Sequence, residues 1–183
     1  MSAANGLKAL WLAYLSKPAD ERVLYRLIRK RKLRKIVEIG IGSGQRALRM
    51  ISLARRYHPA SHVRYTGIDW FEAGEASETE QGMDLKTAYR LLRASGARIH
   101  LVPRDAHEAF ARMANALSGN ELVVIAHQQR LESLGRIWFF LPRMLAPQAV
   151  VLLSRTSDER RTWQPLSLAG IQSLGADPRR RAA

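Results

Sequence analysis

The fold is decided by one stretch, Val37-Glu38-Ile39-Gly40-Ile41-Gly42-Ser43-Gly44, in which a short apolar run passes into three alternating glycines. Residues 36–39 have the length and apolar character of a buried strand, and a helical pattern begins directly after Gly44. Glycine adopts backbone conformations that other residues avoid, and it lets a ligand approach the main chain closely. The free N–H groups at the start of the next helix favour a polar or negative ligand. The stretch therefore predicts a strand, a ligand-binding turn and a helix.

Strands and helices alternate along the rest of the chain. Further apolar runs of strand length occupy residues 63–68, 99–102, 122–126 and 150–153, and helical periodicity marks residues 45–57, 85–94, 106–117 and 131–145. Such alternation predicts right-handed βαβ units and an α/β fold with a doubly wound, mostly parallel sheet covered on both faces. Few residues follow the fifth strand, so we expect a truncated sheet of five or six strands.

The chain is predicted to form a single domain of residues 1–183. Residues 1–35 are expected to be helical, beginning with an amphipathic helix over 6–16 that packs on the domain, and residues 36–155 to form the core. Residues 156–183 are expected to form a tail in which 163–166 make a poor strand. An exposed fifth strand needs cover from this tail or from a second subunit, which makes a homodimer through the sheet edge an open alternative.

The charge is strongly positive, with 30 lysines and arginines against 16 acids and a net charge of +14. Such a balance suits RNA or another polyanion as a partner, and the alternative is a basic protein that binds no nucleic acid. Basic residues crowd the segment 26–35, where part of them also complements a helix C-terminus. There is no cysteine, which excludes disulfides and favours a reducing compartment, the cytoplasm. No apolar run is long enough to span a bilayer, so no membrane partner is expected.

The glycine turn resembles the first motif of the class I S-adenosylmethionine (SAM)-dependent methyltransferases, an acid followed by three alternating glycines. Glu38 stands two residues before the first glycine, as in that family. The resemblance assigns Glu38 to the amino-acid end of SAM, directly or through water. It implies a Rossmann-like methyltransferase fold with SAM as cofactor.

Three further stretches match the family in the same order. Asp69 ends the second strand, where an acid accepts hydrogen bonds from ribose hydroxyls, and Trp70 follows it against the adenine. Asp105 follows the third strand, and the resemblance sets it near the adenine amino group. The turn into the fifth strand matches a fourth motif, with departures at Gln148 and Ala149. The predicted cofactor-binding residues are Glu38, Gly40, Ile41, Gly42, Ser43, Gly44, Asp69, Trp70, Asp105 and Ala106.

The function implied is transfer of a methyl group to an unidentified O or N acceptor. The loop after the fourth strand holds His127, a candidate general base, for which the alternative is a polar loop residue without a catalytic role. No histidine or acid has metal-ligand spacing, so no metal is expected. One alternative function is a non-catalytic SAM- or nucleotide-binding module associated with RNA. Another is a nucleotide-binding oxidoreductase, which Glu38 opposes because its charge would lie beside a pyrophosphate.

Overall fold

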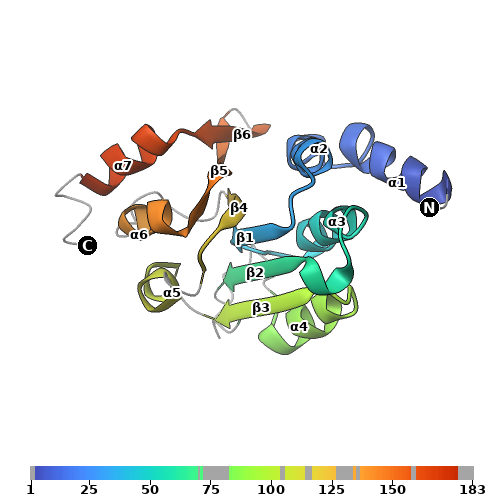
Figure 1. The fold of residues 1–183 in the computed structure, drawn as a ribbon, viewed down its shortest axis with the longest axis horizontal. Coiled ribbons are helices and arrows are strands. Elements are labelled where there is room, and N and C mark those ends of the chain that lie inside the picture. The colour runs from blue at the N-terminus through green and yellow to red at the C-terminus, as the bar shows by residue number, and fades with distance from the viewer. Residues whose placement is uncertain are drawn as a thin grey trace.

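Six strands form one sheet in the order β3-β2-β1-β4-β5-β6 (Figure 1). The computed structural model describes residues 3–69, 71, 83–103, 106–113, 117–126, 134, 137–157 and 160–176. The strands are β1 Lys35–Ile39, β2 Arg64–Asp69, β3 Arg98–Pro103, β4 Asn120–Ile125, β5 Leu145–Ser157 and β6 Arg160–Leu166. The first five are parallel and β6 is antiparallel to β5. The predicted α/β fold with a mostly parallel sheet is confirmed.

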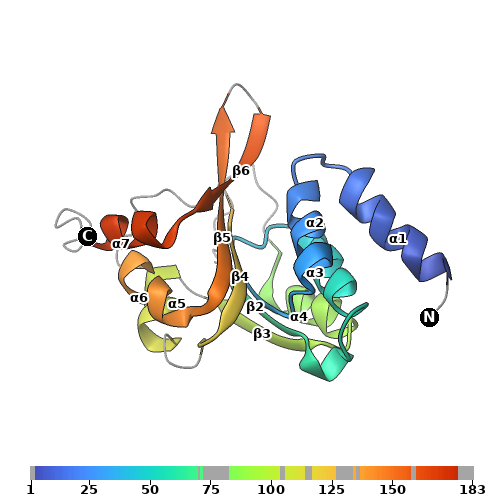
Figure 2. The same cartoon turned by 45° about the horizontal axis from the view of Figure 1, so that its top comes forward.

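Helices cover both faces of the sheet, as the parallel pairing requires. They are α1 Ala3–Tyr14, α2 Arg22–Arg31, α3 Gln45–Ala54, α4 Leu85–Arg93, α5 Ala106–Met113, α6 Ile137–Met144 and α7 Leu168–Ala176, with a short 3-10 turn at Ala60–His62. Helices α2, α3 and α4 lie on one side and α5, α6 and α7 on the other (Figure 2). None of the helices in the described ranges combines the length and apolar character needed to cross a bilayer.

Each face of the sheet has its own hydrophobic core, because successive strand residues point to opposite sides. Ile36 on β1 belongs to the core under α2, α3 and α4, and its neighbour Val37 belongs to the core under α5 and α6. On β4, Leu122 and Val123 divide in the same way. Burial on both faces explains why these strands read as continuous apolar runs in the sequence.

Helix α1 is confirmed, and it packs on the domain through small and medium residues. Ala9, Leu12 and Ala13 are buried, whereas the large side chains at helical spacing, Trp11 and Leu15 among them, are exposed. The helix is therefore turned about its axis relative to the face that its largest apolar residues suggest.

The C-terminal segment folds more fully than expected, because β6 and α7 lie within it. The expectation of a poor strand at 163–166 was wrong. Trp163 is buried, pairs with Ser154 of β5, and its Nε1 donates to Asp20 Oδ2 at 3.2 Å. These tertiary contacts override strand propensity, and Pro165 is tolerated because β6 is an edge strand. The tail therefore covers β5, and a homodimer stays a prediction.

Candidate functional site at the carboxyl edge of the sheet

The glycine turn leaves β1 at the carboxyl edge of the sheet with three residues in the left-handed region. The φ angles of Gly40, Gly42 and Gly44 are 79°, 59° and 72°. A Cβ at Gly42 would meet no atom within 4 Å, whereas a Cβ at Gly44 would lie 2.8 Å from Met83 Cε. Gly42 therefore leaves open space over the main chain where a ligand fits, and Gly44 allows close packing of the turn against its neighbours.

Asp69 joins the end of β2 to this turn. Its Oδ2 accepts hydrogen bonds from the main-chain N–H groups of Ile41 at 2.7 Å and Gly42 at 3.2 Å. The structure thus brings together two motifs that lie far apart in the sequence, because β1 and β2 are parallel neighbours whose carboxyl ends meet at one edge. The Asp69 side chain stays half-buried at the rim of the turn.

Glu38 lies beneath the turn and is fully buried, with both carboxylate oxygens engaged. Its Oε1 pairs with Arg46 Nε at 2.5 Å, and its Oε2 accepts from the Tyr65 hydroxyl at 2.5 Å. Burial raises the pKa of Glu38, while Arg46 opposes this shift by pairing with the ionised carboxylate. Burial and the adjacent Glu38 also raise the pKa of the Tyr65 phenol well above 10. Glu38 therefore faces Arg46 and Tyr65 rather than open space.

Arg46 stands between Glu38 and the surface and is the main site residue that sequence reasoning missed. Besides Glu38, its Nη2 donates to the Gly40 carbonyl at 2.7 Å, and its guanidinium lies 5.4 Å from the centroid of the Trp163 ring. A signal for it was present in the sequence. Arg46 falls in the first turn of α3, where the helix dipole disfavours a cation, so its position calls for a buried acid nearby.

A pocket of about 330 Å³ opens beside the turn, at the low end of the size range of small-molecule sites. Among the described residues, its lining combines three arginines with one acid, Glu21. Glu21 Oε2 accepts from Tyr25 Oη at 2.6 Å and from Arg49 Nη1 at 3.4 Å, and its Oε1 lies 3.8 Å from Arg46 Nη1. The described lining is Pro18, Glu21, Ile41, Gly42, Ser43, Gln45, Arg46, Arg49, Ala126 and Arg161.

Of the remaining predicted site residues, the structure describes some and not others. Ser43 lines the pocket, and Ala106 is the buried first residue of α5. Trp70, Asp105 and His127 lie outside the described residues, so their roles stay predictions. Within the described ranges, no three histidines or acids lie close enough to hold a metal ion.

Comparison with known proteins places the fold. No protein-family model matches the sequence, and no curated protein does. Three similar solved structures are an O-methyltransferase from Bacillus cereus in complex with S-adenosylhomocysteine (SAH), the O-methyltransferase TomG from Streptomyces achromogenes in complex with SAM, and a putative protein-L-isoaspartate O-methyltransferase from Plasmodium falciparum in complex with SAH.

Their sequence identities to this chain are low, at 15%, 19% and 9%, with TM-scores of 0.54, 0.51 and 0.52. The matches cover 97%, 95% and 84% of this chain, and they span 81%, 75% and 66% of the respective neighbours. Together with the strand order and the glycine turn at the carboxyl edge, this likeness shows that the chain has the Rossmann-like fold of the SAM-dependent methyltransferases.

Proposed function

We propose that the protein is a SAM-dependent methyltransferase that transfers a methyl group to an O or N acceptor. One observation carries the proposal. The turn around Gly42 is open to a ligand, is tied to Asp69 at the end of β2, and adjoins a pocket at the carboxyl edge of the sheet. Ligands of open α/β sheets bind in the crevice at this edge. The fold that the chain shares with SAM- and SAH-bound methyltransferases supports the same cofactor.

The charges of the pocket fit the amino-acid end of SAM, which carries an ammonium and a carboxylate. Glu21 is the acid of the described lining, and it suits the ammonium. Arg49 and Arg161 line the same pocket and suit the carboxylate. Glu38 then acts on the cofactor through Arg46, whose guanidinium it holds in place, rather than by direct contact.

The remaining parts of the cofactor fall to the predicted motif residues. Asp69 is proposed to accept hydrogen bonds from the ribose hydroxyls, Trp70 to lie against the adenine, and Asp105 to bind its amino group. When bound, SAM supplies an electrophilic methyl group on its sulfonium. The protein positions the acceptor and excludes water, and these effects suffice for a nucleophilic acceptor. For an acceptor that must lose a proton, His127 is the proposed base.

Calorimetric titration of the protein with SAM, SAH and NAD tests the cofactor, and Gly42→Ala tests the site. A Cβ at Gly42 occupies the open space over the turn, so we expect the affinity for SAM and SAH to fall at least ten-fold. Gly96→Ala is the matched control. Gly96 has a similar φ of 73°, and a Cβ there makes only an ordinary 3.6 Å contact with Ala60, away from the pocket. This variant carries the same backbone strain and is expected to bind like the unchanged protein.

The possible results of these titrations distinguish the proposed cofactor and site from the alternatives. Binding of SAM and SAH without NAD, lost in Gly42→Ala and retained in Gly96→Ala, supports the proposed cofactor and its site. A folded protein that binds neither adenosyl ligand contradicts the proposal, and so does equal binding by the two glycine variants.

A further inference from the structure

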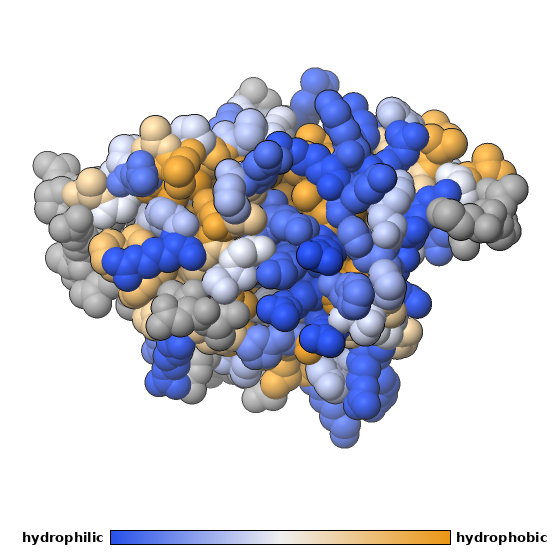
Figure 3. All heavy atoms as spheres, in the orientation of Figure 1, coloured by the Kyte–Doolittle hydropathy of each residue, from blue (hydrophilic) through white to orange (hydrophobic). Residues whose placement is uncertain are grey.

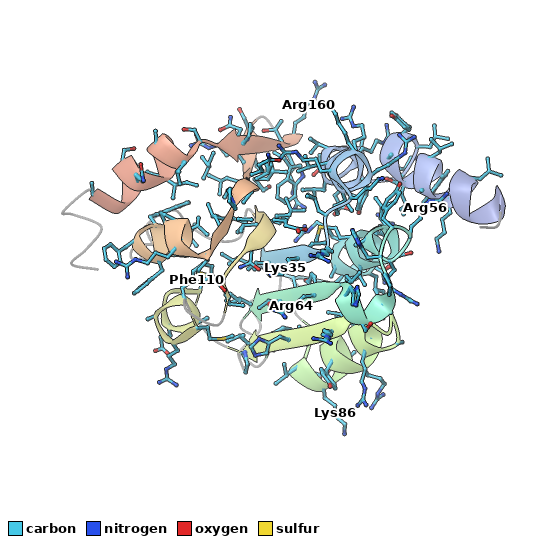
Figure 4. The ribbon with its side chains drawn as sticks, viewed as in Figure 1. Lys35, Arg56, Arg64, Lys86, Phe110 and Arg160 are labelled. Carbon is cyan, nitrogen blue, oxygen red and sulfur yellow. The ribbon has the colours of Figure 1, made fainter. Side chains whose placement is uncertain are left out.

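The opposite, amino edge of the sheet carries a row of cations. Lys35, Arg64 and Arg98 are the first residues of β1, β2 and β3, and they are register partners across these three adjacent strands. Register partners point to the same face, and neighbouring strands lie about 4.8 Å apart. The three basic side chains therefore start side by side. Figure 4 labels Lys35 and Arg64 on their neighbouring strands.

A shallow pocket of about 220 Å³ opens at this row. The 3-10 turn before β2 adds the polar side chains of Ser61 and His62 to it, and Arg34 completes the lining. Arg64 and Arg98 are both exposed. Hydrophilic side chains gather at the centre of the face seen in Figure 3.

Among the described residues, Glu121 on β4 is an acid at this edge, and its carboxylate already interacts with Arg34 and Lys35. Its Oε2 accepts from the main-chain N–H groups of Arg34 at 2.6 Å and Lys35 at 3.2 Å, and its Oε1 lies 3.8 Å from Arg34 Nε. No ion pair reaches Arg64 or Arg98 from the described residues. Like charges opposite one another on adjacent strands destabilise a sheet, and an anion bound between them would offset that cost.

The other basic residues of the segment 26–35 are partly used within the fold. Arg29 lies over the Tyr14 ring and bonds its hydroxyl at 3.3 Å, and Arg31 donates to the Gln148 carbonyl at 2.8 Å. These contacts limit what the helix offers to a partner. The first residues of β2 and β3, by contrast, are the exposed cations Arg64 and Arg98.

We propose that the row formed by Lys35, Arg64 and Arg98 binds consecutive phosphate groups of a single-stranded nucleic acid. Arg64 and Arg98 are exposed, Lys35 is half-buried beside them, and Arg34 adjoins the row. A line of cations suits a chain of phosphates better than one small anion. Arginine and lysine head groups, with Ser and His donors beside them, are the usual partners of nucleic-acid phosphates. The row lies a full strand length, about 17 Å, from the glycine turn, and it does not depend on the proposed methyl transfer.

The test compares two double variants of equal charge. Arg64→Ser with Arg98→Ser removes two cations of the row, and Lys86→Ser with Arg160→Ser removes two cations at distant places on α4 and β6 (Figure 4). Binding of a labelled mixed-sequence single-stranded RNA is measured by fluorescence anisotropy between about 50 and about 200 mM salt. Circular dichroism checks that both variants are folded.

We expect the row variant to bind at least ten-fold more weakly, with a salt dependence reduced by about 1.4 in log–log slope, the value for two phosphate contacts on a single strand. The control variant should stay within two-fold of the unchanged protein. Equal losses in both variants, or no RNA binding at low salt, would overturn the proposal. Displacement of the RNA by micromolar pyrophosphate would also overturn it and would assign the row to a small phosphate ligand.

Discussion

The two ends of strand β1 differ in how their charged side chains are buried and paired. At the carboxyl end, Glu38 is fully buried, and both of its oxygens have protein partners. At the amino end, three residues earlier, Lys35 stands in a row with the exposed Arg64 and Arg98. A buried pair fixes geometry, because either partner alone would be an uncompensated charge in the core. Exposed cations contribute little to stability and remain available to a partner.

The largest expected effect comes from breaking the buried pair. Arg46→Met leaves the Glu38 carboxylate without its cation, and we expect the free energy of unfolding to fall by about 3–5 kcal/mol. Urea denaturation measures the loss. The double variant Glu38→Gln with Arg46→Met removes the uncompensated charge and keeps an acceptor for Tyr65, so it should recover a large part of the stability. An Arg46→Met protein as stable as the unchanged one would contradict the buried pairing.

The next effect concerns the packing of the turn that covers this pair. Gly44→Ala places a Cβ 2.8 Å from Met83 Cε and 3.0 Å from Leu91 Cδ2 at a positive φ, so the ends of these two side chains must shift. We expect a loss of about 2–3 kcal/mol, most of it from backbone strain. Gly42→Ala carries the strain alone and should lose about 1–2 kcal/mol. Thermal and urea unfolding of the two variants measure the difference. Equal losses would show that Gly44 is not needed for close packing.

A smaller effect should appear at high pH. Burial, with Glu38 beside it, holds the pKa of Tyr65 well above 10. Above pH 10 the unfolded chain releases this proton and the folded chain keeps it, so the free energy of unfolding falls as pH rises, by at most about 1.4 kcal/mol per pH unit for this group. Urea unfolding between pH 9 and 11 measures the slope. Burial and Glu21 also raise the pKa of Tyr25, which adds a slope of the same sign, so Tyr65→Phe should make the slope shallower without abolishing it. An unchanged slope in that variant would argue against the buried Tyr65 phenol.

The smallest effect is expected at the amino edge. Glu121→Gln keeps an oxygen that accepts from the N–H groups of Arg34 and Lys35, and it loses only a partly exposed ion pair with Arg34. We expect a change of at most about 1 kcal/mol in the free energy of unfolding. If the free energy of unfolding fell as much as in Arg46→Met in the same urea series, the two ends of the strand would not differ in how much their charges contribute to stability.

Much of the fold could be predicted from the sequence because its signals are local. Apolar runs and helical periodicity located β1 to β5 and most of the helices, and the three glycines located the turn at the end of β1. The sequence also placed Asp69 at the end of β2, whereas its hydrogen bonds to the turn are known only from the structure. These inferences need only the spacing of residue types along the chain.

The remaining features depend on contacts between distant segments. The sequence of β6 has a weak strand pattern, and the strand is stabilised by tertiary contacts instead. Trp163 contacts Asp20 and Arg46, which lie more than 100 residues earlier in the chain. The engagement of Glu38 by Arg46 and Tyr65 depends on how α3 packs over β1 and β2. The face of α1 that packs on the domain could not be predicted either, because it depends on which distant residues the helix contacts. Propensity and periodicity carry no information about such pairings.

Strand β6 also sets the order in which the pocket is completed during synthesis. Arg161 forms part of the pocket wall, and Trp163 lies over Arg46. The glycine turn and its helix leave the ribosome long before these residues do. Until the β5–β6 hairpin has emerged and folded back, the pocket lacks the wall that Arg161 forms, and the Arg46 guanidinium lacks the Trp163 ring. The pocket is therefore complete only when β6 is paired with β5, so a ligand that binds there would also stabilise this hairpin.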